Sequence, residues 1–199
     1  MLSKSYTFLF IGRSGCGKGT QAELLKKYLE ENDKRQILYV YAGSRMRNLI
    51  EKENNLTSQK AKEIMLAGAK QPDFLAIWAW SNEFVEKIKE DMHLIIDGSP
   101  RTIIEAIVLD EAFEFYKREI IKPILLDVSR KWAKDKLLKR ARFDDTEERI
   151  DSRLYYFEKY VQPAIDYYET KSRNKLIKVN GEPTVEEVHK EIMEKLHLL

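Results

Sequence analysis

The stretch that decides the fold is "YTFLFIGRSGCGKGT", residues 6–20. An apolar run passes directly into a glycine-rich segment that contains Lys18. The general phosphate-binding loop, G-x-x-x-x-G-K-[ST], has a hydroxyl residue immediately after its lysine. Here Gly19 holds that position and Thr20 follows one residue later. A strand, a glycine turn and a helix in this order predict a site where backbone N–H groups surround an anion. The ammonium group of Lys18 would add a mobile positive charge to that site.

Short apolar runs alternate with longer segments of helical periodicity along the rest of the chain. The runs cover residues 6–11, 37–41, 94–97, 123–128 and 175–179. Their apolar residues are consecutive, which is typical of strands buried on both faces of a parallel sheet. We therefore predict an α/β fold with a doubly wound, parallel, five-stranded sheet of the P-loop NTPase type. Ligands of such sheets bind at the carboxyl ends of the strands, where the glycine loop falls.

Two intervals are longer than a simple crossover between strands requires. The first, residues 44–90, is expected to hold helices at 45–53, 58–68 and 74–88. The second, residues 129–174, is expected to hold two helices joined by the polar segment "ARFDD". Pro163 should kink the second of these helices or end it at Gln162. We interpret both intervals as lobes on one core.

Charge and composition exclude several classes of protein. The 199 residues carry 35 Lys and Arg against 33 Asp and Glu, which argues against nucleic acid or an anionic membrane as the main partner. No apolar stretch approaches the roughly 20 residues that span a bilayer. The single cysteine, Cys16, excludes an internal disulfide and a multi-cysteine zinc site. We expect a cytoplasmic protein.

A second motif, "LIIDGSPRT", occupies residues 94–102. Its apolar strand ends at Asp97, where a carboxylate near a magnesium–nucleotide complex is expected. The turn that follows would present Arg101 at the same edge of the sheet. Asp97 and Arg101 are therefore candidate site residues.

These motifs together resemble the adenylate kinase family. "GRSGCGKGTQA" is similar to that family's GxxGxGKGTQ loop and "DGSPRT" to its DGFPRT segment, so the displaced hydroxyl is the family's own form of the loop. Three further segments also match in the right order: "AGSRMR" at 42–47, "RARFDDTEERIDSR" at 140–153 and "KVNGEPTVEEV" at 178–188. The resemblance implies reversible phosphoryl transfer from MgATP to a nucleoside monophosphate (NMP).

The resemblance also implies a role for individual residues. The ATP site would comprise Gly15, Cys16, Gly17, Lys18, Gly19, Thr20, Lys136 and Arg140. The NMP site would comprise Ala42, Arg47, Gly98, Arg101, Glu105, Arg142 and Arg153. The catalytic charges would be Lys18, Arg101, Arg140, Arg142 and Arg153. Mg²⁺ would be held by Thr20 and Asp97, while Asp144 and Asp145 would shape the closed lid.

The family's organisation implies one P-loop kinase domain over residues 1–199. Its core would comprise 1–41, 91–128 and 146–199, with an NMP-binding lobe at about 42–72 and a short lid at about 129–145. Closure of both lobes should exclude water. The expected partners are ATP and AMP or another NMP, and a monomer is expected.

Most departures from the family's pattern fall at residues that would contact the bases of the two nucleotides. Lys136 replaces a donor-side arginine, and Ala42 and Glu105 replace residues of the AMP pocket. The family's glutamine at the position of Glu105 offers a donor and an acceptor to adenine, whereas an ionised glutamate offers acceptors only. The overall resemblance favours AMP as the acceptor, with ADP as the product, while GMP, CMP or UMP as the acceptor stays open. Trp78 and Trp80 could line the NMP pocket, but we expect them to pack in the core.

A function of another class is a P-loop switch that hydrolyses nucleotide slowly to regulate a partner. Such a protein would not need arginines around a second phosphate site. The arginines of this chain therefore favour the kinase.

Overall fold

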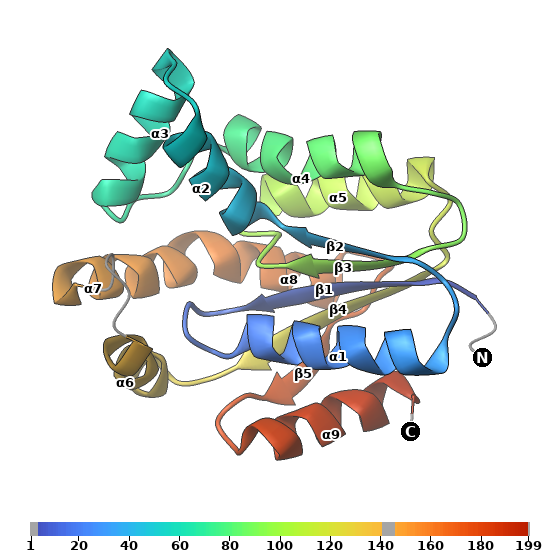
Figure 1. Cartoon of the computed structure of the whole chain (residues 1–199). Coiled ribbons are helices and arrows are strands. Elements are labelled where there is room, and N and C mark those ends of the chain that lie inside the picture. Colours follow the sequence, from blue (N-terminus) through green and yellow to red (C-terminus); the bar gives the residue numbers. More distant parts are fainter. Residues whose placement is uncertain (1–3, 141–145, 199) are drawn as a thin grey trace.

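The computed structural model describes residues 4–140 and 146–198, and these residues form a five-stranded parallel sheet with helices on both faces (Figure 1). The strand order is β2-β3-β1-β4-β5. The strands are β1 (Tyr6–Gly12), β2 (Ile37–Tyr41), β3 (His93–Asp97), β4 (Ile120–Asp127) and β5 (Ile177–Asn180). The predicted fold class is confirmed, because every apolar run found in the sequence forms a strand of this sheet.

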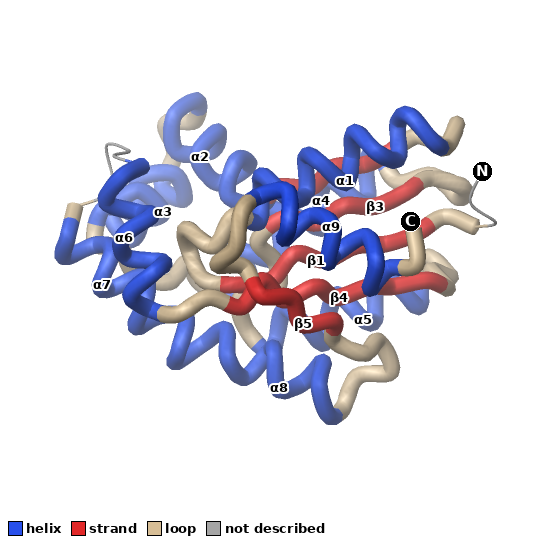
Figure 2. The backbone as a smooth tube through the Cα atoms, turned by 90° about the horizontal axis from the view of Figure 1, so that it is seen from below, coloured by secondary structure: helices blue, strands red, loops and turns tan. Residues whose placement is uncertain are grey.

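The helices α1 to α8 lie between consecutive strands, α9 follows the last strand, and together they cover the sheet on both sides (Figure 2). They are α1 (Lys18–Asn32), α2 (Ala42–Lys52), α3 (Leu56–Leu66), α4 (Asp73–Lys87), α5 (Ile103–Phe115), α6 (Arg130–Arg140), α7 (Glu147–Tyr156), α8 (Gln162–Thr170) and α9 (Val185–Leu196). Within residues 4–140 and 146–198, no helix is long and apolar enough to cross a membrane.

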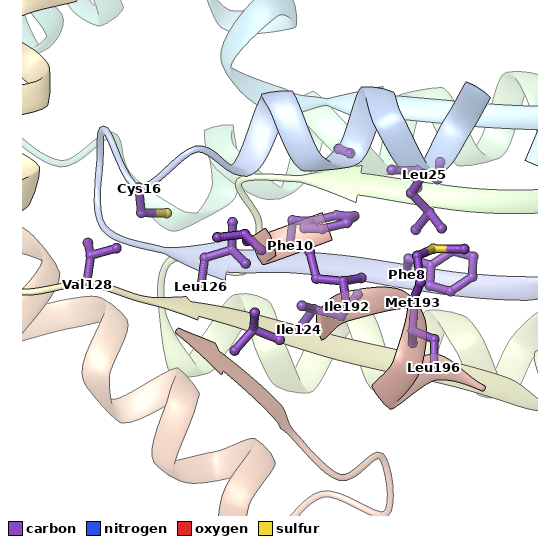
Figure 3. Close-up of a cluster of buried hydrophobic side chains, with 14 of the residues drawn as sticks. Phe8, Phe10, Cys16, Leu25, Ile124, Leu126, Val128, Ile192, Met193 and Leu196 are labelled. Atoms are coloured by element: carbon purple, nitrogen blue, oxygen red, sulfur yellow. The ribbon is translucent and has the colours of Figure 1, made fainter. Parts of the chain in front are cut away.

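Alternate residues of β1 belong to two separate hydrophobic clusters. Phe8 and Phe10 pack in the cluster that includes residues of α1 and α9, part of which Figure 3 shows. Leu9 and Ile11 pack in the cluster that includes residues of α4, α5 and α8. All four side chains are at most 1% exposed. Burial on both faces explains why the strand reads as an uninterrupted apolar run.

Helices α2 and α3 form a small lobe beside α4. Met46, Ala61, Leu75 and Ala79 make up its own buried cluster. The lobe stands at the end of the sheet where β2 finishes (Figure 1). The three helices expected between residues 44 and 90 are therefore present, with their ends shifted by a few residues.

The expectation for Pro163 is wrong in detail. The helix α7 ends at Tyr156, and one π-helical segment, Phe157–Val161, joins it to α8. Pro163 lies in the first turn of α8, which continues in helical conformation from the π-helical segment, so its missing N–H falls inside a continuous helical path. The wider π-helical turn absorbs the break before the proline is reached.

Candidate active site

The register of the sheet brings the ends of three strands to one edge. Asp97 of β3 lies beside Phe10 of β1 and beside Tyr41 of β2. A cleft of roughly 1020 Å³ opens at this edge, between the glycine loop, the small lobe and helices α6 and α7. This is the edge at which ligands of open α/β sheets bind.

The glycine loop joins β1 to α1 and its lysine folds back over it. Gly17 is the N-cap of α1 with φ of 93°, a conformation that a residue with a side chain rarely adopts. The Nζ atom of Lys18 donates to the carbonyl oxygens of Gly12 at 2.8 Å and Arg13 at 2.9 Å. Lys18 therefore bridges the loop, with its ammonium group held at the wall of the cleft.

The structure gives a steric reason for glycine at position 19. A Cβ atom built on Gly19 would lie 3.3 Å from Oδ2 of Asp97, tighter than most such contacts. Gly19 thus lets the start of α1 approach the carboxylate at the end of β3. Thr20, one residue later, also lines the cleft. The close approach therefore explains why glycine, and not a hydroxyl residue, follows Lys18, with the hydroxyl of Thr20 coming one residue later.

Cys16 faces the core. Its side chain is 2% exposed and belongs to the hydrophobic cluster that also holds Leu126 and Val128 (Figure 3). The Sγ atom lies 3.6 Å from Nζ of Lys18. The small thiol fills space beneath the loop while its backbone remains at the cleft.

Asp97 and Thr20 supply oxygen atoms at the same wall of the cleft. Asp97 is 6% exposed, and the hydroxyl of Tyr39 donates to its Oδ2 atom at 3.3 Å. Burial and the carboxylate of Asp97 together raise the pKa of Tyr39, so the phenol stays a donor. Carboxylate and hydroxyl oxygens are ligands that suit Mg²⁺, which retains water and substrate oxygens for the rest of its shell. The residues present therefore fit a magnesium–nucleotide site.

Arg47 of α2 in the small lobe and Arg101 in the turn after β3 both line the cleft. The guanidinium carbon of Arg47 is 5.1 Å from the centre of the Tyr41 ring. Burial alone would raise the pKa of Tyr41, but a hydrogen bond and the positive charge from Arg47 lower it overall. Nε of Arg101 donates to the carbonyl oxygen of Gly98 at 2.8 Å. These contacts hold two guanidinium groups at one end of the cleft.

Glu105 lines the cleft from the first turn of α5. Thr102, the N-cap of that helix, accepts from the backbone N–H of Glu105 at 3.2 Å. The Glu105 side chain is 1% exposed. Burial raises the pKa of this carboxyl, against the opposing effect of the nearby Arg101 charge.

The opposite end of the cleft is lined by α6 and by the loop before α9. Nζ of Lys136 lies 4.8 Å from the centre of the Trp132 ring, and both residues line the cleft. Gly181 and Pro183 of the loop before α9 and Val185 at the start of α9 also line the cleft. Sequence reasoning missed Trp132, although it stands one helical turn before Lys136.

The structure brings together the described residues that the sequence singled out. They line one cleft: Gly15, Cys16, Gly17, Lys18, Gly19, Thr20, Ala42, Arg47, Asp97, Gly98, Arg101, Glu105, Lys136, Arg140 and Arg153. Arg142, Asp144 and Asp145 lie outside the described residues. Trp80 is 1% exposed in the core and Trp78 packs against the cluster of the small lobe, as expected. Tyr39, Tyr41 and Tyr156 also line the cleft and were not predicted.

A parallel sheet that delivers a glycine loop with a lysine to its carboxyl edge defines a nucleotide-binding protein of the P-loop class. The family model for adenylate kinase matches residues 10–173 of the chain. The chain therefore belongs to the adenylate kinase family.

Individual relatives agree with the family model. The chain is 33% identical to adenylate kinase 1 of Nostoc sp. over 184 residues, which cover 92% of this chain and 95% of that protein. It is 32% identical to an adenylate kinase of Leptospira biflexa over 192 residues, covering 94% and 98%. It is 31% identical to an adenylate kinase of Prochlorococcus marinus over 188 residues, covering 94% and 97%. The similarity spans nearly the whole chain.

Proposed function

We propose that the protein is an ATP:AMP phosphotransferase, which transfers a phosphoryl group reversibly from MgATP to AMP and yields ADP. The observation that carries this proposal is the arrangement of positive charge in one cleft. Lys18 lies in the glycine loop between β1 and α1, whereas Arg47 lies in α2 after β2 and Arg101 in the turn after β3, and all three line the cleft. Two separate groups of phosphate-binding side chains suit two nucleotides that meet end to end.

The chemistry of this transfer requires alignment and charge stabilisation. The acceptor is the phosphate of AMP, which is already ionised, so no side chain has to remove a proton from it. Planar guanidinium groups grip phosphate oxygens with two hydrogen bonds at once. We assign this role to Arg47 and Arg101 on the AMP phosphate, and to Arg140 and Arg153 around the transferring group. Arg142 belongs to the same proposal.

Thr20 and Asp97 are the residues proposed to hold Mg²⁺. The metal, when bound with ATP, neutralises charge that develops on the phosphate oxygens. The hydrogen bond from Tyr39 fixes one oxygen of Asp97 and orients the carboxylate toward the start of α1. Lys18 completes the positive surroundings of the donor phosphates.

The donor base is assigned to the end of the cleft between α6 and the loop before α9. Lys136 keeps the charge of the family's arginine at this position but has no planar group to stack on a base. Trp132, beside it, offers a flat aromatic surface facing the same space. The proposal therefore gives Trp132 the stacking role and Lys136 an electrostatic one.

The lobes belong to the same proposal. Residues of about 42–72 form the NMP-binding lobe and residues of about 129–145 the short lid, on a core of 1–41, 91–128 and 146–199. Their closure over two nucleotides would exclude water and suppress hydrolysis of ATP. We propose a monomer that acts in the cytoplasm, with small nucleotides as its partners.

A bisubstrate probe tests the two-site arrangement before any turnover is measured. The probe joins two adenosines through five phosphates, and the measurement is the midpoint of thermal unfolding with Mg²⁺ present. A ligand that binds only the folded state stabilises it by an amount that grows with its affinity, about 2.7 kcal/mol at 100 times its Kd. The probe should raise the midpoint far more than the same concentration of ATP, because it fills both ends of the cleft.

The matched control is a probe with one adenosine and the same number of phosphates. Equal stabilisation by this control, by ATP and by the two-adenosine probe would contradict the proposal and favour a P-loop switch with a single nucleotide site.

A further inference from the structure

Glu105 occupies an unusual position for a carboxyl group. It is 1% exposed, it lines the cleft, and it stands in the first turn of α5, four residues after Arg101 in the sequence. Among residues 4–140 and 146–198, its Oε2 atom is buried and has no hydrogen-bond partner. Buried polar atoms nearly always have partners, and those that lack one need an explanation. A small turn of the side chain toward the cleft would let a bound ligand provide the missing partner.

The surroundings of Glu105 balance two opposing effects. Burial raises the pKa of the carboxyl, while the Arg101 charge and hydrogen bonds from the Ser99 side chain and the Arg101 backbone lower it. Asp73 of α4 raises it further. Tyr156 of α7 and Tyr168 of α8 also face this carboxyl, and burial raises the pKa of both phenols. Among the described residues, Arg101 supplies the main positive charge that opposes the effect of burial on the pKa of Glu105.

The hydrogen-bonding edge of adenine distinguishes the two forms of the carboxyl. Adenine offers an acceptor at N1 beside a donor at its N6 amino group. An ionised carboxylate is an acceptor only, whereas a protonated carboxyl has one O–H donor and one acceptor oxygen. A neutral carboxyl matches both atoms, as the amide of glutamine would. Guanine presents two adjacent N–H donors and would match the ionised form instead.

We propose that Glu105 recognises the base of AMP as a neutral carboxylic acid, with its Oε2–H group donating to adenine N1 and its other oxygen accepting from N6. This inference rests on the proposed function. It gives the Oε2 atom of Glu105, which has no hydrogen-bond partner in the structure, a role in determining base specificity. It also provides a donor for adenine N1, which an ionised glutamate could not offer. A neutral glutamate and a glutamine at this position would then both recognise adenine.

Binding of AMP itself favours the neutral form. The AMP phosphate carries nearly two negative charges at neutral pH and would pair with Arg101. That pairing weakens the support that Arg101 gives to an ionised Glu105. The bound base also covers the carboxyl, and loss of water disfavours the charged form further. One proton passes from solvent to Glu105 as AMP binds, and no bond of AMP is made or broken.

The pH dependence of AMP affinity gives the first test, measured by calorimetry with the full chain between pH 5.5 and 9. Uptake of one proton makes Kd for AMP rise about tenfold per pH unit wherever Glu105 is ionised in the free protein. The Glu105→Gln variant should bind AMP with a nearly constant Kd above the pKa of the AMP phosphate. Glu111→Gln, an exposed position of the same helix, is the matched control and should follow the wild type.

The infrared spectrum of the AMP complex decides the protonation state directly. The difference between wild type and Glu105→Gln should contain the carbonyl stretch of a neutral carboxylic acid. The carbonyl band supports the proposal whether or not the Kd for AMP depends on pH. If the band is present and the Kd is constant, Glu105 is neutral in the free protein as well as in the complex. A spectrum with only the carboxylate bands overturns the proposal, whatever the profile.

The same samples separate this inference from the proposed function. ADP formation from AMP together with an ionised Glu105 in the complex would refute the inference and leave the function intact. Phosphorylation of GMP in place of AMP would refute the proposed acceptor, and the ionised carboxylate would then be the guanine reader.

Discussion

Replacing Lys18 with methionine is expected to lower kcat by about 10²–10³-fold, the effect of removing one preorganised charged donor from a transition state. The ammonium group already lies within the loop, on the carbonyl oxygens of Gly12 and Arg13. It has only to move from these acceptors to a phosphate as the nucleotide enters. Methionine preserves the apolar stem and removes the charge, and steady-state rates of ADP formation give the measurement.

The loss must be separated from damage to the loop, because Lys18 also bridges two of its carbonyl groups. The thermal unfolding midpoint of Lys18→Met and its Kd for ATP report on that structural role. Lys27→Met is the matched control on the same helix, since its side chain is 72% exposed. A Lys18→Met enzyme that keeps nearly wild-type kcat would remove Lys18 from the proposed catalytic charges.

Replacing Arg101 with methionine is expected to lower kcat/KM for AMP by about 10²–10³-fold, which corresponds to roughly 3–4 kcal/mol of lost transition-state stabilisation. The side chain is exposed at the cleft, and its Nε atom is held by the carbonyl oxygen of Gly98. That contact leaves the other guanidinium nitrogens to meet an incoming phosphate. Initial rates at varied AMP and saturating ATP measure the effect.

The effect of Arg101→Met should be confined to the acceptor. The Kd for ATP should stay close to that of the wild type, because the glycine loop and α6 form the opposite part of the cleft. Arg173→Met, a substitution of an exposed arginine away from the cleft, is the control for loss of charge alone. Equal weakening of ATP and AMP would show that Arg101 supports the cleft as a whole.

The sequence was sufficient to predict the sheet and the part of the cleft that the glycine loop and the motif residues line. Strands buried on both faces read as apolar runs, and the glycine loop marks the edge at which ligands bind. The motif residues follow from local patterns, so Gly17, Lys18 and Asp97 could be assigned to the site from the sequence alone. Their convergence then follows from the parallel register of β1, β2 and β3.

Contacts between distant segments could not be predicted in the same way. Tyr39 approaches Asp97 because β2 pairs with β3, and no local pattern marks that tyrosine. Trp132 has the same residue type as the core residue Trp80, and only the packing of α6 distinguishes them. The protonation state of Glu105 depends on its burial among α5 and neighbouring elements, which the sequence does not reveal. From the sequence alone, the residue is expected to be an ionised glutamate, which can only accept hydrogen bonds.

The measurement that tests the central claim most directly is the rate of nucleoside diphosphate formation from MgATP with AMP, GMP, CMP and UMP in parallel. We expect rapid formation of two ADP for each AMP consumed, with much slower reaction of the other three acceptors. Preference for GMP, CMP or UMP, or ATP hydrolysis that is indifferent to every monophosphate, would contradict this claim.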